Sequence, residues 1–163
     1  MAEKDEKIYY GPVKKKFDEL FSSKGETYLE ITANKTFSNK LKKEIPDYKQ
    51  LIFYFLDQVA PDITGFIKRT YGTEFIIIEV KDEVIKLDHI YQVRKYAELF
   101  DARFAFLVST HEIPEEIKKL SKIIFPYLFA LPAYRRLTLV QFDKNTNQFI
   151  DWFEENPFEK EWK

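Results

Sequence analysis

Apolar residues follow their most regular pattern between residues 75 and 108. Residues 75–81 (FIIIEVK) and 102–108 (ARFAFLV) are apolar on both faces, as expected of strands in the middle of a sheet that helices cover on both sides. Residues 88–100 lie between them and have the periodicity of a helix. The buried stripe of this helix is predicted to contain Ile90, Val93, Ala97 and Phe100. Strand, helix and strand together predict a crossover unit with neighbouring parallel strands.

The other segments extend this unit into an α/β fold. Alternating or apolar segments predict further strands at residues 28–32, 63–69, 137–142 and 148–153, the last two as a C-terminal β-hairpin. Helices are predicted at 13–21, from a cap at Ser38 to 45, and from Pro114 onward. Residues 51–56 (LIFYFL) fit either a strand or a buried helix. The chain is therefore predicted to form one domain, residues 1–163, with a mixed sheet flanked by helices.

Composition and charge exclude several classes of function. The chain has no cysteine, which excludes thiol catalysis, disulfides, zinc–thiolate sites and iron–sulfur clusters. No segment approaches the roughly 20 apolar residues of a membrane helix, and the charged N-terminus MAEKDEKIYY has no signal-peptide pattern. We therefore expect a cytoplasmic protein without a membrane partner. A net charge of −1 counts against indiscriminate nucleic-acid binding.

The end of the strand at 75–81 carries the candidate chemistry. Alternate residues of a strand share a face, so Glu79 and Lys81 point the same way and lie where the apolar core gives way to solvent. If 63–69 and 75–81 form an antiparallel hairpin, Asp62 comes beside both. Two carboxylates in a partly dry place repel each other unless one is protonated or a cation lies between them. Such oxygen ligands favour Mg²⁺ or Mn²⁺.

These residues resemble a known motif. Pro61-Asp62 and, seventeen positions after the aspartate, Glu79-Val80-Lys81 are similar to the PD-(D/E)XK signature of the restriction-endonuclease-like nuclease superfamily. The element order over residues of about 38–110 is similar to the core of that family. Gln92 and Tyr96, on the helix after the motif strand, resemble the QxxxY motif of its RecB-like branch.

The resemblance implies a metal-dependent nuclease that hydrolyses phosphodiester bonds, with DNA favoured over RNA. The implied catalytic residues are Asp62, Glu79, Lys81 and Gln92. The implied ligands of Mg²⁺ or Mn²⁺ are Asp62, Glu79, the Val80 carbonyl and an upstream acid, for which Glu44 is the first candidate and Glu30 the second. The expected substrate contacts are Tyr96, Arg94, Lys95 and Lys68.

Other interpretations remain open. The fold could serve as a non-catalytic binding module, as one half of a homodimer, or as a subunit of a larger DNA-processing or defence complex. The aromatic runs at 53–55 and 125–129 fit a core or an oligomer interface. Arg135 and Arg136, like Arg94 and Lys95, could grip phosphates, although a solvated face is the simpler interpretation. His89 and His111 are expected at the surface, because two isolated histidines are too few for a metal cluster.

Overall fold

A mixed β-sheet organises the molecule. In the computed structural model the chain is described over residues 2–162, and its side chains from Glu6 onward. The described residues form a seven-stranded sheet in the order β1-β2-β3-β4-β6-β5, with β7 also paired to β6. β1 (Glu26–Ile31), β2 (Ile63–Arg69) and β3 (Gly72–Lys81) pair antiparallel. β4 (Phe104–Ser109) and β6 (Arg135–Asp143) run parallel to β3, whereas β5 (Ala130–Leu131) and β7 (Gln148–Phe153) pair antiparallel with β6.

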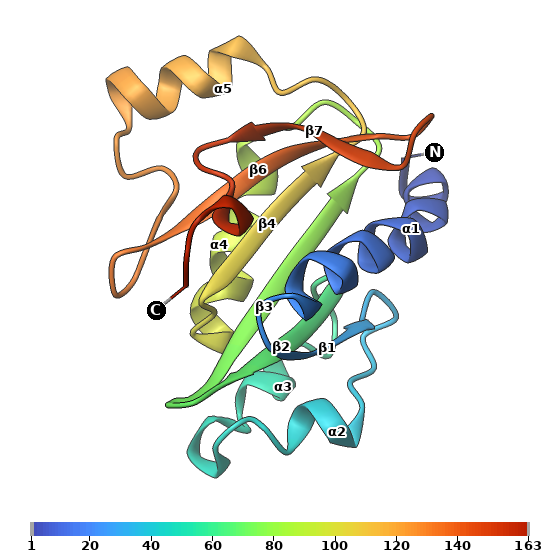
Figure 1. The fold of residues 1–163 in the computed structure, drawn as a ribbon, viewed down its shortest axis with the longest axis vertical. Helices are drawn as coiled ribbons and strands as arrows, with labels where there is room; N and C mark the ends of the chain where they lie inside the picture. Colours follow the sequence, from blue (N-terminus) through green and yellow to red (C-terminus); the bar gives the residue numbers. More distant parts are fainter. Residues whose placement is uncertain (1, 163) are drawn as a thin grey trace.

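Two helices cover opposite faces of the sheet (Figure 1). α4 (Leu87–Phe100) packs on the face that carries Phe75 and Ile77. α1 (Ala2–Ser22) packs on the face that carries Ile76, Ile78 and Val80. The predicted division of side chains between the two faces of β3 is therefore confirmed, as is the α/β class with a C-terminal hairpin.

Short helices fill the connections. Between β1 and β2 lie α2 (Asn39–Lys42), the 3₁₀ turn at Asp47–Lys49 and α3 (Ile52–Phe55). After β4 come α5 (Glu115–Lys119) and a π-helical turn at Leu120–Ile124, and a 3₁₀ turn at Pro157–Glu159 follows β7. Ser38 caps α2 as predicted, because its side chain accepts a hydrogen bond from the Leu41 N–H. The ambiguous segment 51–56 is helical, with Tyr54 and Phe55 exposed rather than buried.

The first helix is much longer than predicted. It begins at Ala2 rather than near Val13 and passes through Pro12. Its buried side chains recur every three or four residues: Glu6, Tyr10, Val13, Phe17 and Phe21. The charged N-terminal segment thus continues an apolar stripe and places a carboxyl group, Glu6, on its buried side. The N-terminal end of α1 lies near the carboxyl end of β3 (Figure 1).

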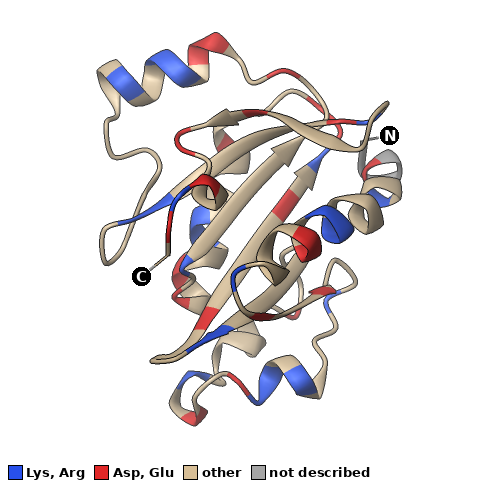
Figure 2. Cartoon of the chain, in the orientation of Figure 1, with Lys and Arg blue, Asp and Glu red and all other residues tan. Residues whose placement is uncertain are grey.

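Charged residues are sparse on the strands of the sheet. Figure 2 shows long uncharged stretches along the central strands, on which the acidic positions of β3 stand out. Within residues 2–162, no helix has both the length and the apolarity needed to cross a membrane.

Candidate functional site

The start of β2 and the end of β3 bring Asp62 and Glu79 into contact. The antiparallel pairing of Ile63 with Ile78 puts the residue before β2 beside the last residues of β3. The Asp62 N–H donates to Glu79 Oε1 at 3.0 Å, and the Val80 N–H donates to Asp62 Oδ2 at 2.8 Å. Asp62 is 8% exposed and Glu79 is 1% exposed. The two carboxyl groups therefore meet at a nearly dry point.

Lys81 completes this cluster. Its Nζ lies 3.8 Å from Glu79 Oε2, and its side chain is only 15% exposed. The alternation of the strand accounts for this contact, because residues 79 and 81 share a face. The structure thus brings Asp62, Glu79 and Lys81 together as the sequence predicts.

Proline at position 61 affects the Val80 carbonyl. Two residues beyond the Ile63–Ile78 pair, position 61 falls opposite Val80. The Val80 N–H faces β2, since it reaches Asp62, and in a strand the carbonyl of the same residue points to the same side. Proline has no N–H to donate. The Val80 carbonyl therefore faces the side of β3 on which Asp62 lies, and it receives no backbone hydrogen bond from residue 61.

Buried threonines hold the Pro61–Asp62 segment in place. The Thr32 hydroxyl donates to the Pro61 carbonyl at 2.6 Å, and the Thr32 N–H donates to the Asp62 carbonyl at 2.8 Å. The hydroxyls of Thr32 and Thr64 lie 2.8 Å apart. Both threonines are fully buried, so the backbone that carries Asp62 has little freedom to move.

α1 adds two residues that the sequence analysis did not identify. Tyr10 is 6% exposed and hydrogen-bonds through its hydroxyl to the Asp62 carboxyl group. Glu6, one turn earlier and 5% exposed, interacts electrostatically with Lys81 and Asp62. The sequence does contain a signal for them. Positions 6, 10, 13 and 17 are three or four residues apart, as on one face of a helix, and they extend the buried stripe into the charged N-terminus.

Burial dominates the electrostatics of the cluster. It raises the pKa of Glu79 well above its usual value, and the neighbouring Asp62 charge raises it further. Burial also raises the pKa of Asp62, although the Val80 N–H and the Lys81 charge act in the opposite direction. The pKa of Glu6 rises to about 7, first because of burial and then because Asp62 and Glu83 repel its charge. Burial therefore shifts all three carboxyl groups toward their neutral forms, and a bound cation would oppose that shift.

The polar pair on α4 reaches the same region from the opposite face. Gln92 Nε2 lies 3.4 Å from Tyr96 Oη. Burial raises the pKa of Tyr96 to about 12, and the charges of Glu79 and Asp62 contribute to that rise. Tyr96 was not among the residues predicted for the buried stripe of this helix, but it is fully buried, because its ring packs in the core between α4 and the sheet.

Several predicted residues lie elsewhere. Glu44 pairs with Lys68 at 3.2 Å, near the end of β2, which is about 20 Å along the strand from Asp62 at roughly 3.3 Å per residue. Neither residue is therefore placed at the cluster, because α2 packs at the far end of the sheet. Glu30 accepts hydrogen bonds from the backbone and hydroxyl of Ser38.

The basic residues of α4 also lie away from the carboxylates. Arg94 lies over the Tyr91 ring and Lys95 over the Tyr96 ring, at 5.5 and 5.0 Å from the ring centroids. Both line a shallow depression on the outer side of the helix with Glu98 and Leu99.

His89 is more enclosed than predicted. Its side chain is 12% exposed, because Nδ1 accepts from the Lys86 N–H at 3.0 Å while Nε2 lies 2.8 Å from Glu83 Oε1. Burial lowers its pKa, and the Lys81 charge lowers it further. His111 has a side chain 44% exposed, as expected of a surface residue.

No family model, curated protein or solved structure matches this chain. Among the side chains that the structure describes, no three His, Cys, Asp or Glu groups meet in a metal-binding arrangement.

Proposed function

We propose that this protein is a metal-dependent nuclease that hydrolyses phosphodiester bonds in nucleic acid, with DNA as the preferred substrate. One observation carries the proposal: two buried carboxyl groups, Asp62 and Glu79, lie in contact with each other and beside Lys81. A structural role alone does not require two like charges and an ammonium at one nearly dry point, since burying such groups costs stability.

The donor set fits a hard divalent cation. Asp62 and Glu79 supply carboxylate oxygens, and Val80 supplies a carbonyl that Pro61 cannot pair. Burial raises the pKa of both acids, and the Asp62 charge raises the pKa of Glu79 further. A cation between them would relieve both effects. Two carboxylates and one carbonyl suffice for Mg²⁺, which usually retains several waters as further ligands.

The chain's own residues have separate roles in this proposal. When bound, a divalent cation would supply Lewis-acid polarisation of the phosphate and lower the pKa of a coordinated water. The Lys81 ammonium would orient the attacking water and offset the charge that develops on the phosphate. Glu6, with a pKa of about 7, is suited to accept a proton near neutral pH. Tyr10 would orient Asp62 through its hydroxyl, while Gln92 would act through Tyr96.

A second candidate function is a non-catalytic nuclease-like module that serves as a binding subunit of a larger complex. Two observations favour it. The net charge of −1 gives the chain little general attraction for nucleic acid, and backbone N–H groups already satisfy one oxygen each of Asp62 and Glu79.

A cleavage assay separates the two functions. Wild type is incubated with single-stranded, duplex, flapped and branched DNA in Mn²⁺, in Mg²⁺ and in EDTA. We expect cleavage of at least one substrate in metal and none in EDTA. Lys81→Ala should slow cleavage by several orders of magnitude, whereas Lys119→Ala, an exposed lysine on α5, should leave it unchanged. An absence of metal-dependent cleavage by wild type on every substrate would favour the binding module.

A further inference from the structure

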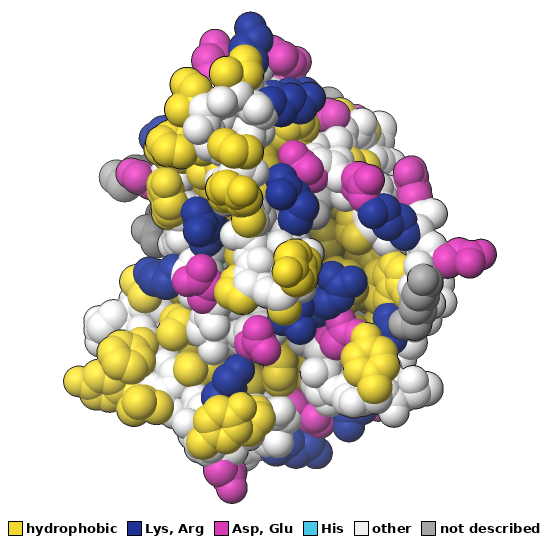
Figure 3. Space-filling view, turned by 90° about the vertical axis from the view of Figure 1, so that its left-hand side faces the viewer, with side chains coloured by type: hydrophobic (Ala, Val, Ile, Leu, Met, Phe, Trp, Pro, Cys, Tyr) yellow, Lys and Arg dark blue, Asp and Glu magenta, His cyan; other side chains and the backbone are white. Residues whose placement is uncertain are grey.

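A polar cavity lies at the end of the sheet opposite the carboxylate cluster. It has a volume of about 630 Å³ and is lined by the first residues of β3, β4 and β6 and by the C-terminal segment. One of its lining residues, Glu74, is five positions before Glu79 on β3, which is about 17 Å at roughly 3.3 Å per residue. Figure 3 looks onto this side of the molecule, where basic and acidic side chains surround a hollow. This cavity is therefore separate from the carboxylate cluster.

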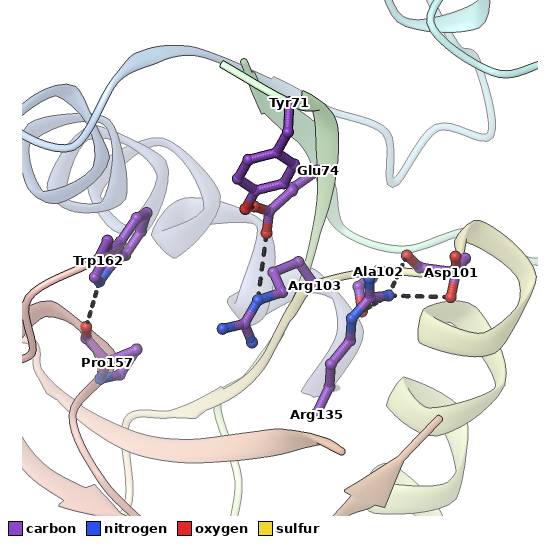
Figure 4. Close-up of polar contacts among 8 residues, drawn as sticks. All are labelled: Tyr71, Glu74, Asp101, Ala102, Arg103, Arg135, Pro157 and Trp162. Atoms are coloured by element: carbon purple, nitrogen blue, oxygen red, sulfur yellow. Dashed lines mark hydrogen bonds and ion pairs between the residues drawn. The ribbon is translucent and has the colours of Figure 1, made fainter. Parts of the chain in front are cut away.

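A buried acid fixes one arginine at the cavity. Glu74 is 8% exposed; its Oε1 accepts from the Tyr71 hydroxyl, and its Oε2 lies 3.3 Å from Arg103 Nε. Oε2 is buried and accepts no hydrogen bond of good geometry from the described residues. The ion pair with Arg103 therefore compensates the cost of burying this oxygen. Because Glu74 engages only Nε, the Nη groups of Arg103 project into the space between Trp162 and Arg135 (Figure 4).

Two further arginines flank this space. One Nη of Arg135 donates to the Asp101 carbonyl at 2.9 Å and contacts its carboxylate at 3.0 Å. Arg136 Nε lies 3.4 Å from Glu154 Oε2. An arginine carries five N–H donors in a rigid fork, so each of these contacts orients the guanidinium and leaves other donors for a ligand. The sequence analysis had named Arg135 and Arg136 as residues that could bind phosphates.

Aromatic side chains form the wall and the rim. Trp162 stacks on Phe104 at 4.8 Å, and its indole N–H donates to the Pro157 carbonyl at 2.8 Å. Arg69 lies 5.0 Å from the centre of the Trp162 ring. At the rim, Tyr134 is fully exposed and Tyr71 is 68% exposed. Exposed rings beside arginines are the groups that proteins use to stack bases next to phosphates.

We propose that this cavity binds a nucleotide, free or as part of a strand, with its phosphate on Arg103 and Arg136 and its base on the tyrosines of the rim. Arg135, whose Nη is held by Asp101 and Ala102, forms part of the wall. Arginine forks match phosphate geometry, and the volume is in the range of roughly 300–1,000 Å³ that small-ligand sites occupy. Three further acids, Glu154, Glu155 and Glu161, line the cavity beside its basic residues. Glu155 is paired with Lys160. Glu154 is paired with Arg136, and such partly exposed ion pairs contribute little to stability, so a phosphate can exchange with them.

Isothermal titration calorimetry in EDTA tests the proposal without involving a metal. The probes are AMP, inorganic phosphate, adenosine, and a short single-stranded DNA with and without a 5′-phosphate. We expect AMP to bind more tightly than either phosphate or adenosine, because each of these offers only one half of the contacts. Binding of the oligonucleotide only when it is phosphorylated would assign the site to strand ends, whereas binding of AMP alone would assign it to free nucleotides.

Variants separate this site from the carboxylate cluster. Arg136→Gln, and the double variant Glu74→Gln with Arg103→Gln that leaves no buried charge unpaired, should each weaken binding by about tenfold or more. Lys119→Gln, on α5 away from the cavity, is the charge-matched control and should bind as wild type does. Lys81→Ala should also bind normally even if the nuclease proposal fails. No binding of AMP or of either oligonucleotide by folded wild type, or equal binding by Arg136→Gln and wild type, would overturn the proposal.

Discussion

Glu6 should make the metal-free protein less stable as the pH rises. It is only 5% exposed, and it faces Asp62 just before β2, Lys81 at the end of β3 and Glu83 in the following loop. Glu6→Gln keeps the shape and the acceptor for the Asp82 N–H but cannot ionise. The variant therefore resembles the protonated wild type at every pH.

The size and sign of the effect follow from the pKa values. Glu6 has a folded-state pKa of about 7 against an ordinary value of 4.5. A raised pKa contributes stability that is present below 4.5 and is lost as the pH rises through about 7, since the folded state binds the proton more tightly. At roughly 1.36 kcal/mol per pKa unit, Glu6→Gln should gain about 1 kcal/mol over wild type at pH 5 and about 3 kcal/mol at pH 8.

Urea unfolding in EDTA at pH 5 and pH 8 measures this gain. Glu19→Gln, on the same helix with a side chain 57% exposed, is the control and should give the same small difference at both pH values. A gain for Glu6→Gln that does not depend on pH would refute the argument that burial beside Asp62 strains this carboxyl group.

The remaining predictions concern its neighbours. Asp62→Asn should be more stable than wild type in EDTA by about 1 kcal/mol, because one of two like charges is removed. In saturating Mn²⁺ it should be less stable than wild type, because only wild type gains binding energy from the ion. Thermal melts in the two buffers should show this reversal, and a stability difference that is the same with and without metal would exclude Asp62 as a ligand. Tyr10→Phe should lose about 1.5–3 kcal/mol of stability in urea unfolding, since it removes a hydrogen bond to a carboxylate; an unchanged midpoint would show that this bond contributes nothing.

Local patterns account for what the sequence predicted well. The hairpin of β2 and β3 joins segments close in sequence, and the period of two along a strand fixes which side chains share a face. The sequence alone therefore sufficed to place Asp62, Glu79 and Lys81 together. The pattern of strand, helix and strand also sufficed to predict that β3 and β4 are parallel neighbours. The spacing of four on the connecting helix placed Gln92 and Tyr96 on one side of it.

Long-range docking accounts for what the sequence did not predict. Glu6 and Tyr10 reach Asp62 only because α1 lies across the sheet, and a charged N-terminal segment gives little sign of being buried. Glu44 lies upstream of Asp62 in the sequence, as expected of the additional acidic ligand. However, α2 and the residues after it pack at the far end of β2, where Glu44 pairs with Lys68. Arg103, Arg135 and Arg136 come together only through the pairing of β4 with β6.

Calorimetric titration with Mn²⁺ tests the central claim most directly. Wild type should bind Mn²⁺ at one site, and Mg²⁺ more weakly, following the general order of affinities. Glu79→Gln, which keeps the acceptor for the Asp62 N–H but loses the charge, should abolish that binding, whereas Glu44→Gln should leave it unchanged. Equal Mn²⁺ binding by wild type and Glu79→Gln would contradict the account, because the proposed site cannot hold a cation without that carboxylate.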